Sequence, residues 1–307
     1  GGKFADGKGH ASAYVDYRKI EKLTKSERDY LNCSVWSSAE GPVCGGSSST
    51  PWGTFIIPHL DPTYRVGWAE DGYNGHEFVE RTSADVFNYG PYNFIQRPDE
   101  KWNAGGFAHY TINDHFEPYL EVMFMRDYTD AQIAPSGNFG VTNTINCDNP
   151  MLSEQQRNLI CTQAGYGPED SAWVVSFRRN VEGDARSNQI GHTNFRLVAG
   201  LRGDINDAWS YDLYGLHAES NAQFSFVNDL NVQRIQNALD VIVDPDTGEW
   251  VCRSGSDDGC VPWNIFEEGA VTQEALDYIS ATALMSTDHV TRVLNLTFEG
   301  DHESYVL

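Results

Sequence analysis

The sequence lacks long apolar runs and has few positive charges. No stretch approaches the roughly 18 apolar residues that a membrane-spanning helix requires, and the mean hydropathy is −0.47. The 21 Lys and Arg residues are outnumbered by 44 Asp and Glu residues, which gives a formal net charge of −23. Such a surface repels nucleic-acid phosphates and does not dock on an anionic leaflet. The composition argues against membrane helices and predicts no nucleic-acid partner.

The sequence also lacks the motifs of common enzymes and metal sites. HExxH, GxSxG and the P-loop are absent, and the acidic couples 257–258 and 267–268 are interpreted as solvated loop residues. Segment 244–249 has oxygen atoms at alternate positions but not the rest of a calcium loop, and its Pro-Asp-Thr-Gly sequence is a good turn. His109, His115 and His192 have no mutual metal spacing. We therefore expect no catalytic residue, no cofactor and no bound metal.

Six cysteines fall into three close couples. These are Cys33 with Cys44, Cys147 with Cys161, and Cys252 with Cys260. Fifteen connectivities are possible, and proximity favours the three local ones, each closing a short loop rich in Ser, Gly, Asn or Asp. None has CxxC or zinc spacing. Three loop disulfides predict an oxidising compartment: the periplasm, the cell surface or the exterior.

Several segments alternate between apolar and polar residues with period 2, which predicts strands with one apolar and one polar face. The segments are 10–19, 102–112, 119–124, 194–202, 210–213 and 294–299. A composition with 12% aromatic residues and 28 glycines fits a β-rich chain with many turns. A low mean hydropathy is compatible with membrane strands, because every second residue of a barrel strand is polar.

The connections between these strands are of two kinds. Short polar turns at 113–115 and 203–207 join two pairs, whereas long segments at about 22–99, 129–191 and 221–287 lie between the pairs. All three cysteine couples lie in the long segments. Short turns at one end and long loops at the other are typical of outer-membrane β-barrels. The sequence thus predicts an all-β, antiparallel transmembrane barrel segment with long extracellular loops.

The long segments carry further elements. Short strands are expected at 52–58, 63–68 and 171–178. Two short loop helices are expected, one within 230–243 from the spacing of Val232, Ile235, Leu239 and Val243, and one at 272–279 with Thr272 as its N-cap. No repeat and no clear linker is present, so the chain is assigned to one domain, 1–307.

A collinear series of motifs resembles the TonB-dependent receptors. Segment 87–100 (FNYGPYNFIQRPDE) is similar to the FNYAPYNYLQRPDER segment of many of these receptors. Further motifs follow in order: 131–137 (AQIAPSG), 145–150 (INCDNP), 178–183 (RRNVEG), 192–193 (HT), 201–204 (LRGD), 238–241 (ALDV), 260–266 (CVPWNIF) and 271–276 (VTQEAL). The series covers nearly the whole chain.

The resemblance implies a transporter of the Gram-negative outer membrane, built as a 22-stranded barrel closed by a plug domain. Such receptors import iron-siderophores, cobalamin, saccharides or oligopeptides with energy that the TonB complex passes from the inner membrane. The implied partners are outer-membrane lipid and lipopolysaccharide, the plug, the TonB complex and a small-molecule cargo.

The chain departs from a complete receptor, because no plug domain, TonB-contacting box or terminal aromatic strand is recognised. About 6–8 spanning strands of about 9–11 residues fit into it, roughly a third of the family's barrel. Because open sheet edges are not tolerated in lipid, the expectation is a partial barrel domain that needs the remaining strands.

Candidate functional residues follow from this interpretation. Lumen-facing polar residues are predicted at Asp16, Arg18, Glu121, Arg196, Arg202 and Asp212. Loop tryptophans predicted to form either ligand-stacking surfaces or loop packing are Trp36, Trp52, Trp68, Trp173, Trp250 and Trp263. Trp102 and Trp209, next to turns or strand starts, suit the aromatic girdles of a barrel.

Two other classes of function are also compatible with the sequence. One is an ungated porin or an adhesin-like barrel, which uses the same strands without TonB. The other is a secreted β-rich glycan-binding protein or glycosidase, which would be soluble without detergent.

Overall fold

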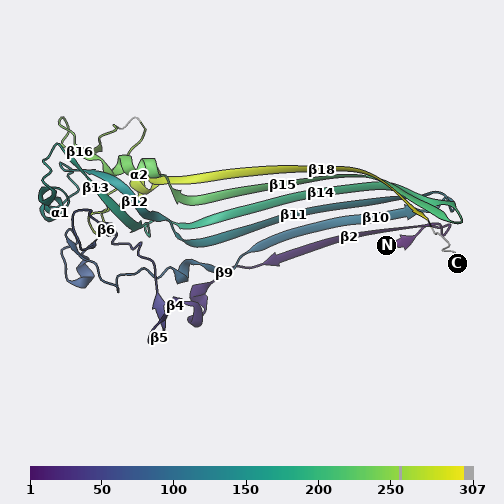
Figure 1. The fold of residues 1–307 in the computed structure, drawn as a ribbon, viewed down its shortest axis with the longest axis horizontal. Coiled ribbons are helices and arrows are strands. Elements are labelled where there is room, and N and C mark those ends of the chain that lie inside the picture. Colours follow the sequence, from purple (N-terminus) through teal and green to yellow (C-terminus); the bar gives the residue numbers. More distant parts are fainter. Residues whose placement is uncertain (256–257, 301–307) are drawn as a thin grey trace, which may run out of the picture.

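A computed structural model describes residues 1–255 and 258–300 of the chain. It consists of one long, gently curved antiparallel sheet and a compact lobe at one end of that sheet (Figure 1). We call this lobe the cap; it is built from residues 46–87, 136–180, 231–255 and 258–279. The N-terminus and the end of the last strand lie at the opposite end of the sheet.

The long sheet has seven strands in the order β1-β2-β10-β11-β14-β15-β18. Its strands are β1 (Gly2–Lys3), β2 (Gly9–Ile20), β10 (Asp99–Tyr110), β11 (Glu117–Pro135), β14 (Ala185–Asn206), β15 (Trp209–Leu230) and β18 (Ser280–Gly300). All pairs are antiparallel. The sheet is open, and no pairing among the described residues joins β18 to β1 or β2. The predicted antiparallel β class is confirmed, whereas a closed barrel is not seen.

The strands of this sheet are longer than the sequence predicted. Segments 129–135, 185–191, 221–230 and 280–287 were assigned to loops, but they continue the ladders of β11, β14, β15 and β18. Segment 185–191 carries polar residues on both faces and therefore shows no alternation. In 221–226 the apolar residues Ala222, Phe224 and Phe226 do alternate with polar ones, but they lie on the face that is polar farther down β15, so the phase of the pattern changes along the strand. The backbone groups of these segments nevertheless pair with the neighbouring strand, which satisfies them.

The connections at the far end of the sheet are short, as predicted. β10 and β11 are joined across 111–116, where Asn113 pairs with Phe116. The second turn was placed too early, because Gly203–Asn206 still belongs to β14, and only Asp207 and Ala208 separate it from β15.

The cap is organised around a five-stranded sheet in the order β12-β13-β6-β7-β8. Its strands are β6 (Thr54–Ile56), β7 (Tyr64–Val66), β8 (Phe78–Glu80), β12 (Gly137–Asn146) and β13 (Ser171–Arg179), next to the hairpin of β16 (Val241–Val243) and β17 (Trp250–Cys252). The strands β6, β7 and β13 agree with the sequence prediction. β12 was not predicted.

The described part of the cap contains three α-helices rather than one or two. They are α1 (Glu154–Ile160), α2 (Val232–Leu239) and α3 (Gln273–Ile279). Thr272 caps α3 by accepting from the amide of Ala275, as predicted. α1 was missed, although Ser153 and Gln156 form a capping box that the sequence displays. α2 is shorter than the predicted 230–243 segment, which also contains the end of β15 and all of β16.

Two small two-stranded sheets and five short 3-10 helices complete the described fold. β3 (Leu23–Thr24) pairs with β9 (Phe94–Gln96), and β4 (Ser34–Ser38) pairs with β5 (Gly41–Gly45). The 3-10 helices are η1 (Lys25–Glu27), η2 (Asp29–Leu31), η3 (Ala69–Asp71), η4 (Gly90–Tyr92) and η5 (Thr162–Ala164). No helix in the described part of the chain is both long and apolar enough to cross a bilayer.

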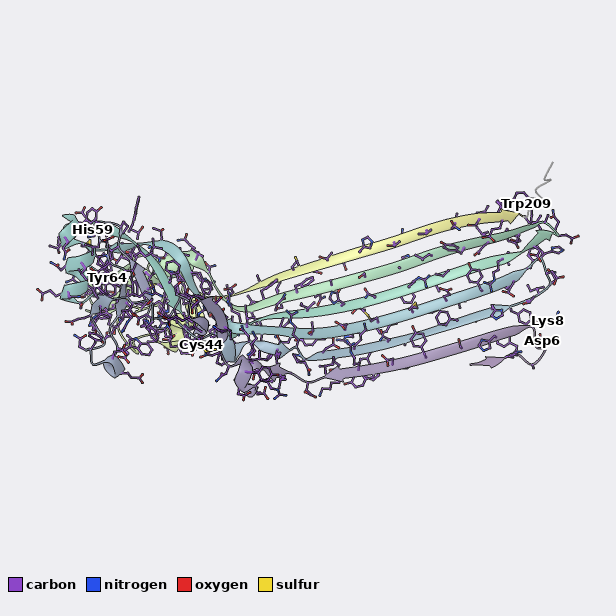
Figure 2. All side chains as sticks on the ribbon, turned by 60° about the horizontal axis from the view of Figure 1, so that its bottom comes forward. Asp6, Lys8, Cys44, His59, Tyr64 and Trp209 are labelled. Atoms are coloured by element: carbon purple, nitrogen blue, oxygen red, sulfur yellow. A yellow bond between two sulfur atoms is a disulfide. The ribbon has the colours of Figure 1, made fainter. Side chains whose placement is uncertain are left out.

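The hydrophobic core lies in the cap and not in the long sheet. Phe55, Phe78, Phe266 and Trp263 are buried there together with aliphatic residues from all three cap segments. In the long strands, the only buried hydrophobic side chains described are Ala134 and Val198. Figure 2 shows this contrast, with side chains crowded around His59 and Tyr64 and spread thinly along the sheet towards Trp209. Parts of all three predicted long loops thus share one core, whereas the strands of the long sheet bury almost no apolar side chains.

The three local disulfides are confirmed. Cys33 is bonded to Cys44, Cys147 to Cys161 and Cys252 to Cys260. The second bond lies in the cap core, whereas the first closes the exposed β4–β5 hairpin.

Candidate functional site

The register of the long sheet brings the six predicted lumen-facing residues to one face. This face, which we call the polar face, consists of the even-numbered residues of β2, β14 and β15 and the odd-numbered residues of β10, β11 and β18. Directly opposed pairs include Arg202 with Glu117 and with Asp212. Since side chains alternate along a strand, Asp16, Arg18, Glu121 and Arg196 share this face through the same ladders.

Charged side chains on the polar face are paired across neighbouring strands. Arg202 Nη2 lies 2.6 Å from Glu117, Arg196 Nη1 lies 2.7 Å from Glu121, and Arg18 Nη2 lies 2.7 Å from Asp99. The Tyr119 hydroxyl donates to Asp212 over 2.8 Å, and Asn103 donates to Asp16 over 3.2 Å. Asp99, Asn103, Glu117 and Tyr119 were not singled out from the sequence, because cross-strand partners follow from register. The result is a hydrogen-bonded polar wall.

The opposite face carries a continuous apolar surface, which we call the apolar belt. Its members are Ala11, Ala13, Val15 and Tyr17 on β2; Trp102, Ala104, Gly106, Ala108 and Tyr110 on β10; Leu120, Val122 and Phe124 on β11; Phe195, Leu197, Ala199 and Leu201 on β14; Trp209, Tyr211, Leu213 and Gly215 on β15; and Leu294, Leu296 and Phe298 on β18. The register places them on one face. Most of its large side chains are exposed, and Leu294 is 82% exposed.

Aromatic residues lie at both limits of the apolar belt. Tyr17 and Trp102 pack against each other at the limit nearer the cap, with their rings tilted by 38° and the ring centroids 4.4 Å apart. Tyr110, Tyr211 and Trp209 lie at the limit nearer the turns, and Figure 2 shows Trp209 at that end of the sheet. Eight residues separate Trp102 from Tyr110, or about 27 Å at about 3.4 Å per residue. A strand tilt of about 40° reduces this to about 21 Å, close to the apolar band of about 25 Å on membrane barrels.

The apolar belt is slanted relative to the strands. On β10 it begins at Trp102, but the residues in the same row on β15 and β18 are Asn221 and Asp288. On β18 it begins at Leu294, which lies in the row of Ala108, six residues nearer the turns. Barrel strands tilt by about 35–45° from the membrane normal. A band that is parallel to the membrane plane therefore crosses neighbouring strands at successively shifted residues, which gives this slant.

The six predicted loop tryptophans occupy three kinds of environment. Trp173, Trp36 and Trp250 are exposed by 68%, 51% and 45% and lie on three different strands, β13, β4 and β17. Trp52 and Trp68 are half-buried and pack edge to face, 5.3 Å apart, against the cap core. Trp263 is fully buried in that core, so it presents no ring surface to a ligand.

One buried arginine joins the cap to the sheet. Arg179, at the end of β13, is 4% exposed and donates to the carbonyl of Pro135 over 2.8 Å and to the Ser47 hydroxyl over 3.0 Å. Its guanidinium also lies over the rings of Phe139 and Phe87, at 4.8 and 5.3 Å. Burial lowers the pKa of Arg179 to about 10, which leaves it charged at neutral pH. Arg179 belongs to the 178–183 motif, but no local sequence pattern predicts this role.

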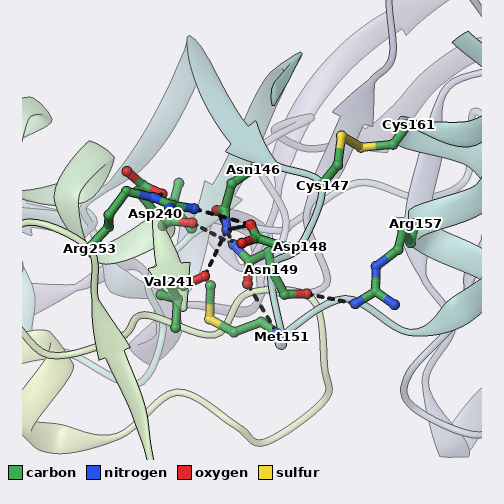
Figure 3. A network of polar contacts seen from close by, with 11 residues as sticks. Asn146, Cys147, Asp148, Asn149, Met151, Arg157, Cys161, Asp240, Val241 and Arg253 are labelled. Carbon is green, nitrogen blue, oxygen red and sulfur yellow. Dashed lines mark hydrogen bonds and ion pairs between the residues drawn. A yellow bond between two sulfur atoms is a disulfide. The ribbon is translucent and has the colours of Figure 1, made fainter. Parts of the chain in front are cut away.

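A polar network inside the cap connects the β12–α1 loop to the segment after α2 (Figure 3). Asn146 donates to the carbonyl of Val241 over 2.8 Å, and Asn149 donates to that of Leu239 over 2.8 Å. Arg253 bridges Asp240 and Asp148 at 3.0 and 3.1 Å. Because buried amides that make their hydrogen bonds specify one arrangement, this network fixes two distant loops against each other.

The residues weighed for metal or acid/base chemistry have structural partners. Asp244 accepts from the amides of Asp246 and Thr247, which makes 244–249 the turn of the β16–β17 hairpin. His115 Nδ1 lies 2.6 Å from the carbonyl of Asp204, and His109 and His192 each lie near a carboxylate on a neighbouring strand. No group of three His, Cys, Asp or Glu side chains is placed to hold a metal ion in the described ranges 1–255 and 258–300. Asp257 lies outside these ranges.

In comparisons with known proteins, no family model, no curated protein and no solved structure matches this chain.

Proposed function

We propose that this chain forms part of the wall of an outer-membrane β-barrel of the TonB-dependent transporter type, with its cap on the extracellular side. The observation that carries the proposal is the apolar belt, exposed on one face of an antiparallel sheet whose other face is polar and internally paired. An exposed apolar surface of this extent is rare on soluble monomers and marks a contact with lipid or protein. The aromatic residues at both limits of the belt, and its slant relative to the strands, favour lipid over a protein partner.

The asymmetry of the sheet supports the orientation. The end with the short turns needs only to reverse the chain, whereas the cap end carries folded loops with three disulfides. Disulfides persist in oxidising surroundings, which suits the cell exterior. In this proposal the polar face lines the lumen, and the exposed rings of Trp36, Trp173 and Trp250 are available to an incoming cargo.

The membrane placement can be tested by epitope tags in the complete protein. One tag replaces Asp114 in the β10–β11 turn, and a second is inserted after Gly72, beyond η3. We expect the protein in the detergent-extractable outer-membrane fraction, with the Gly72 tag accessible to antibody on intact cells and the Asp114 tag accessible only after permeabilisation. Release of the protein into a detergent-free soluble fraction would contradict the barrel and favour a secreted glycan-binding protein.

The transport role needs a separate measurement. A strain without the gene should lose growth on one scarce nutrient, tested among ferric chelates, cobalamin, oligosaccharides and peptides. Uptake of that nutrient by the wild type should stop when a protonophore collapses the inner-membrane gradient. Uptake that continues without the gradient would indicate an ungated porin instead.

A further inference from the structure

A row of basic side chains borders the apolar belt on the side of the cap. On four of the six long strands, the first residue beyond the belt on the same face is basic: Lys19 after Tyr17, Arg126 after Phe124, His217 after Gly215, and Arg292 next to Leu294. We call these four residues the basic row. On β10 and β14 the equivalent positions hold Glu100 and Thr193.

The basic row follows the slant of the apolar belt along its cap-side limit. No corresponding row of basic residues borders the turn-side limit of the belt in the described strands. Arg292 lies in the row of Val122, four residues nearer the turns than Arg126, and the limit of the belt moves in the same direction. Next to the turn-side limit the same face carries Gly203 on β14 and Gly300 on β18. Basic residues are scarce in this chain, which has 21 of them against 44 acidic residues. Their alignment along the cap-side limit of the belt is therefore a specific feature of this surface.

Two members of the basic row carry charge that the described structure leaves unpaired. Lys19 is 2.7 Å from Glu21, and His217 is 3.0 Å from Glu219. Arg126 and Arg292 are exposed, and neither has a carboxylate within salt-bridge distance in the part of the chain that the structure describes. The nearest carboxylates on this face are Glu100, which is directly opposed to Lys19 and diagonal to Arg126, and Glu219, which is diagonal to Arg292. Asp288 lies four residues from Arg292, towards the cap.

We propose that Arg126 and Arg292, supported by Lys19 and His217, bind phosphate groups of the lipid headgroups in the outer leaflet. The inference rests on the proposed membrane placement, because that placement puts the row at the level where hydrocarbon gives way to headgroups. Arginine presents a planar fork that matches phosphate, and its apolar stem lies along the belt while its charged end reaches the interface. Three strand spacings, about 14 Å, separate β11 from β18, so each arginine holds its own phosphate.

The test is a lipid-binding titration on the complete protein in neutral detergent. The probe is diphosphoryl lipid A in mixed micelles, compared with the same lipid after enzymatic removal of both phosphates. Each of Arg126→Gln and Arg292→Gln should raise the dissociation constant for the phosphorylated lipid about fivefold, and neither should change binding of the dephosphorylated lipid. The matched control is Lys101→Gln, since Lys101 lies between the rows of Lys19 and Arg126, one residue from each, but on the polar face.

The outcomes separate this inference from the proposed function. If both arginine variants remain in the outer membrane and bind the phosphorylated lipid as the wild type does, the phosphate site is refuted while the barrel stands. An equal loss for Lys101→Gln also refutes it, because the effect then reflects net charge. If the wild-type protein is not in the membrane fraction, both proposals fall together.

Discussion

The ring of Tyr119 lies over Gly200 on the adjacent strand, and a Cβ atom at position 200 would stand 2.5 Å from its Cε1 atom. Tyr119 and Gly200 are directly opposed in the β11–β14 ladder. The same arrangement recurs on the polar face, where the ring of Tyr14 lies over Gly105. Glycine permits the ring to lie flat against the sheet, so the Tyr119 hydroxyl reaches Asp212 two strands away.

Replacing Gly200 by Ala should therefore displace the Tyr119 ring and break its hydrogen bond to Asp212. We expect a loss of about 1–3 kcal/mol in the free energy of unfolding, as for other overpacked sites. Urea unfolding of the purified protein in detergent measures it. Gly191→Ala on the same strand is the control, since a Cβ there meets nothing within 4 Å; similar losses in the two variants would mean that the ring contact is unimportant.

A lysine at Leu296 tests which face of the sheet meets lipid. Leu296 lies between Leu294 and Phe298 in the apolar belt and is exposed, whereas its neighbour Asn295 belongs to the polar face. Leu296→Lys should destabilise the membrane-inserted form by about 2–4 kcal/mol, the cost of a basic residue near the bilayer midplane. Folding equilibria in lipid vesicles give this value. Asn295→Lys should cost much less; equal costs for the two lysines would argue against a lipid contact.

The Cys147–Cys161 disulfide should be the one on which the cap depends. The two cysteines are buried in the cap core. Removing the bond costs about 3 kcal/mol of folding stability in the entropic model, because the unfolded chain is no longer restricted, and it also removes contacts in the core. In a double Ser variant we expect faster hydrogen exchange throughout the cap peptides, followed by mass spectrometry. The matched variant is Cys33→Ser with Cys44→Ser, which should affect only the exposed β4–β5 hairpin. Cap-wide exchange in that variant would show that the two bonds are equivalent.

The stability of helix α3 should depend on pH through Asp258. The Tyr278 hydroxyl donates to Asp258 over 2.9 Å and lowers the pKa of that carboxyl below its usual 3.8. A carboxyl with a lowered pKa binds fewer protons in the folded state, so its contribution is present above its unfolded pKa and is lost as the pH falls through the folded value. Tyr278→Phe should therefore weaken α3 at neutral pH and have a smaller effect in strong acid.

Hydrogen exchange of the 273–279 peptide at the two pH values measures that dependence. Tyr64→Phe is the control, because the pKa of Tyr64 is raised mainly by burial and its hydroxyl makes no hydrogen bond to a carboxylate in the described structure. A Tyr278→Phe effect that is the same in acid and at neutral pH would rule out the carboxylate as its cause.

Features that depend on neighbouring residues could be read from the sequence. Alternation placed Asp16, Arg18, Glu121, Arg196, Arg202 and Asp212 on a polar side of their strands, and the register confirms that they share one face. Close spacing predicted the three disulfides, and Thr272 marked the start of α3. The capping box at Ser153 was equally visible and would have revealed α1.

Features that depend on residues far apart were decided only by the tertiary structure. The cap-side part of β14, residues 185–191, has polar residues on both faces and becomes a strand because the backbones of β11 and β15 pair with it. Trp263 is a core residue and Arg179 a link between three segments because the cap brings together chain regions about a hundred residues apart. The slanted belt and its basic row appear only once register aligns the strands. Periodicity and short loops are local properties of a chain, whereas register and packing are set by contacts that the local sequence does not contain.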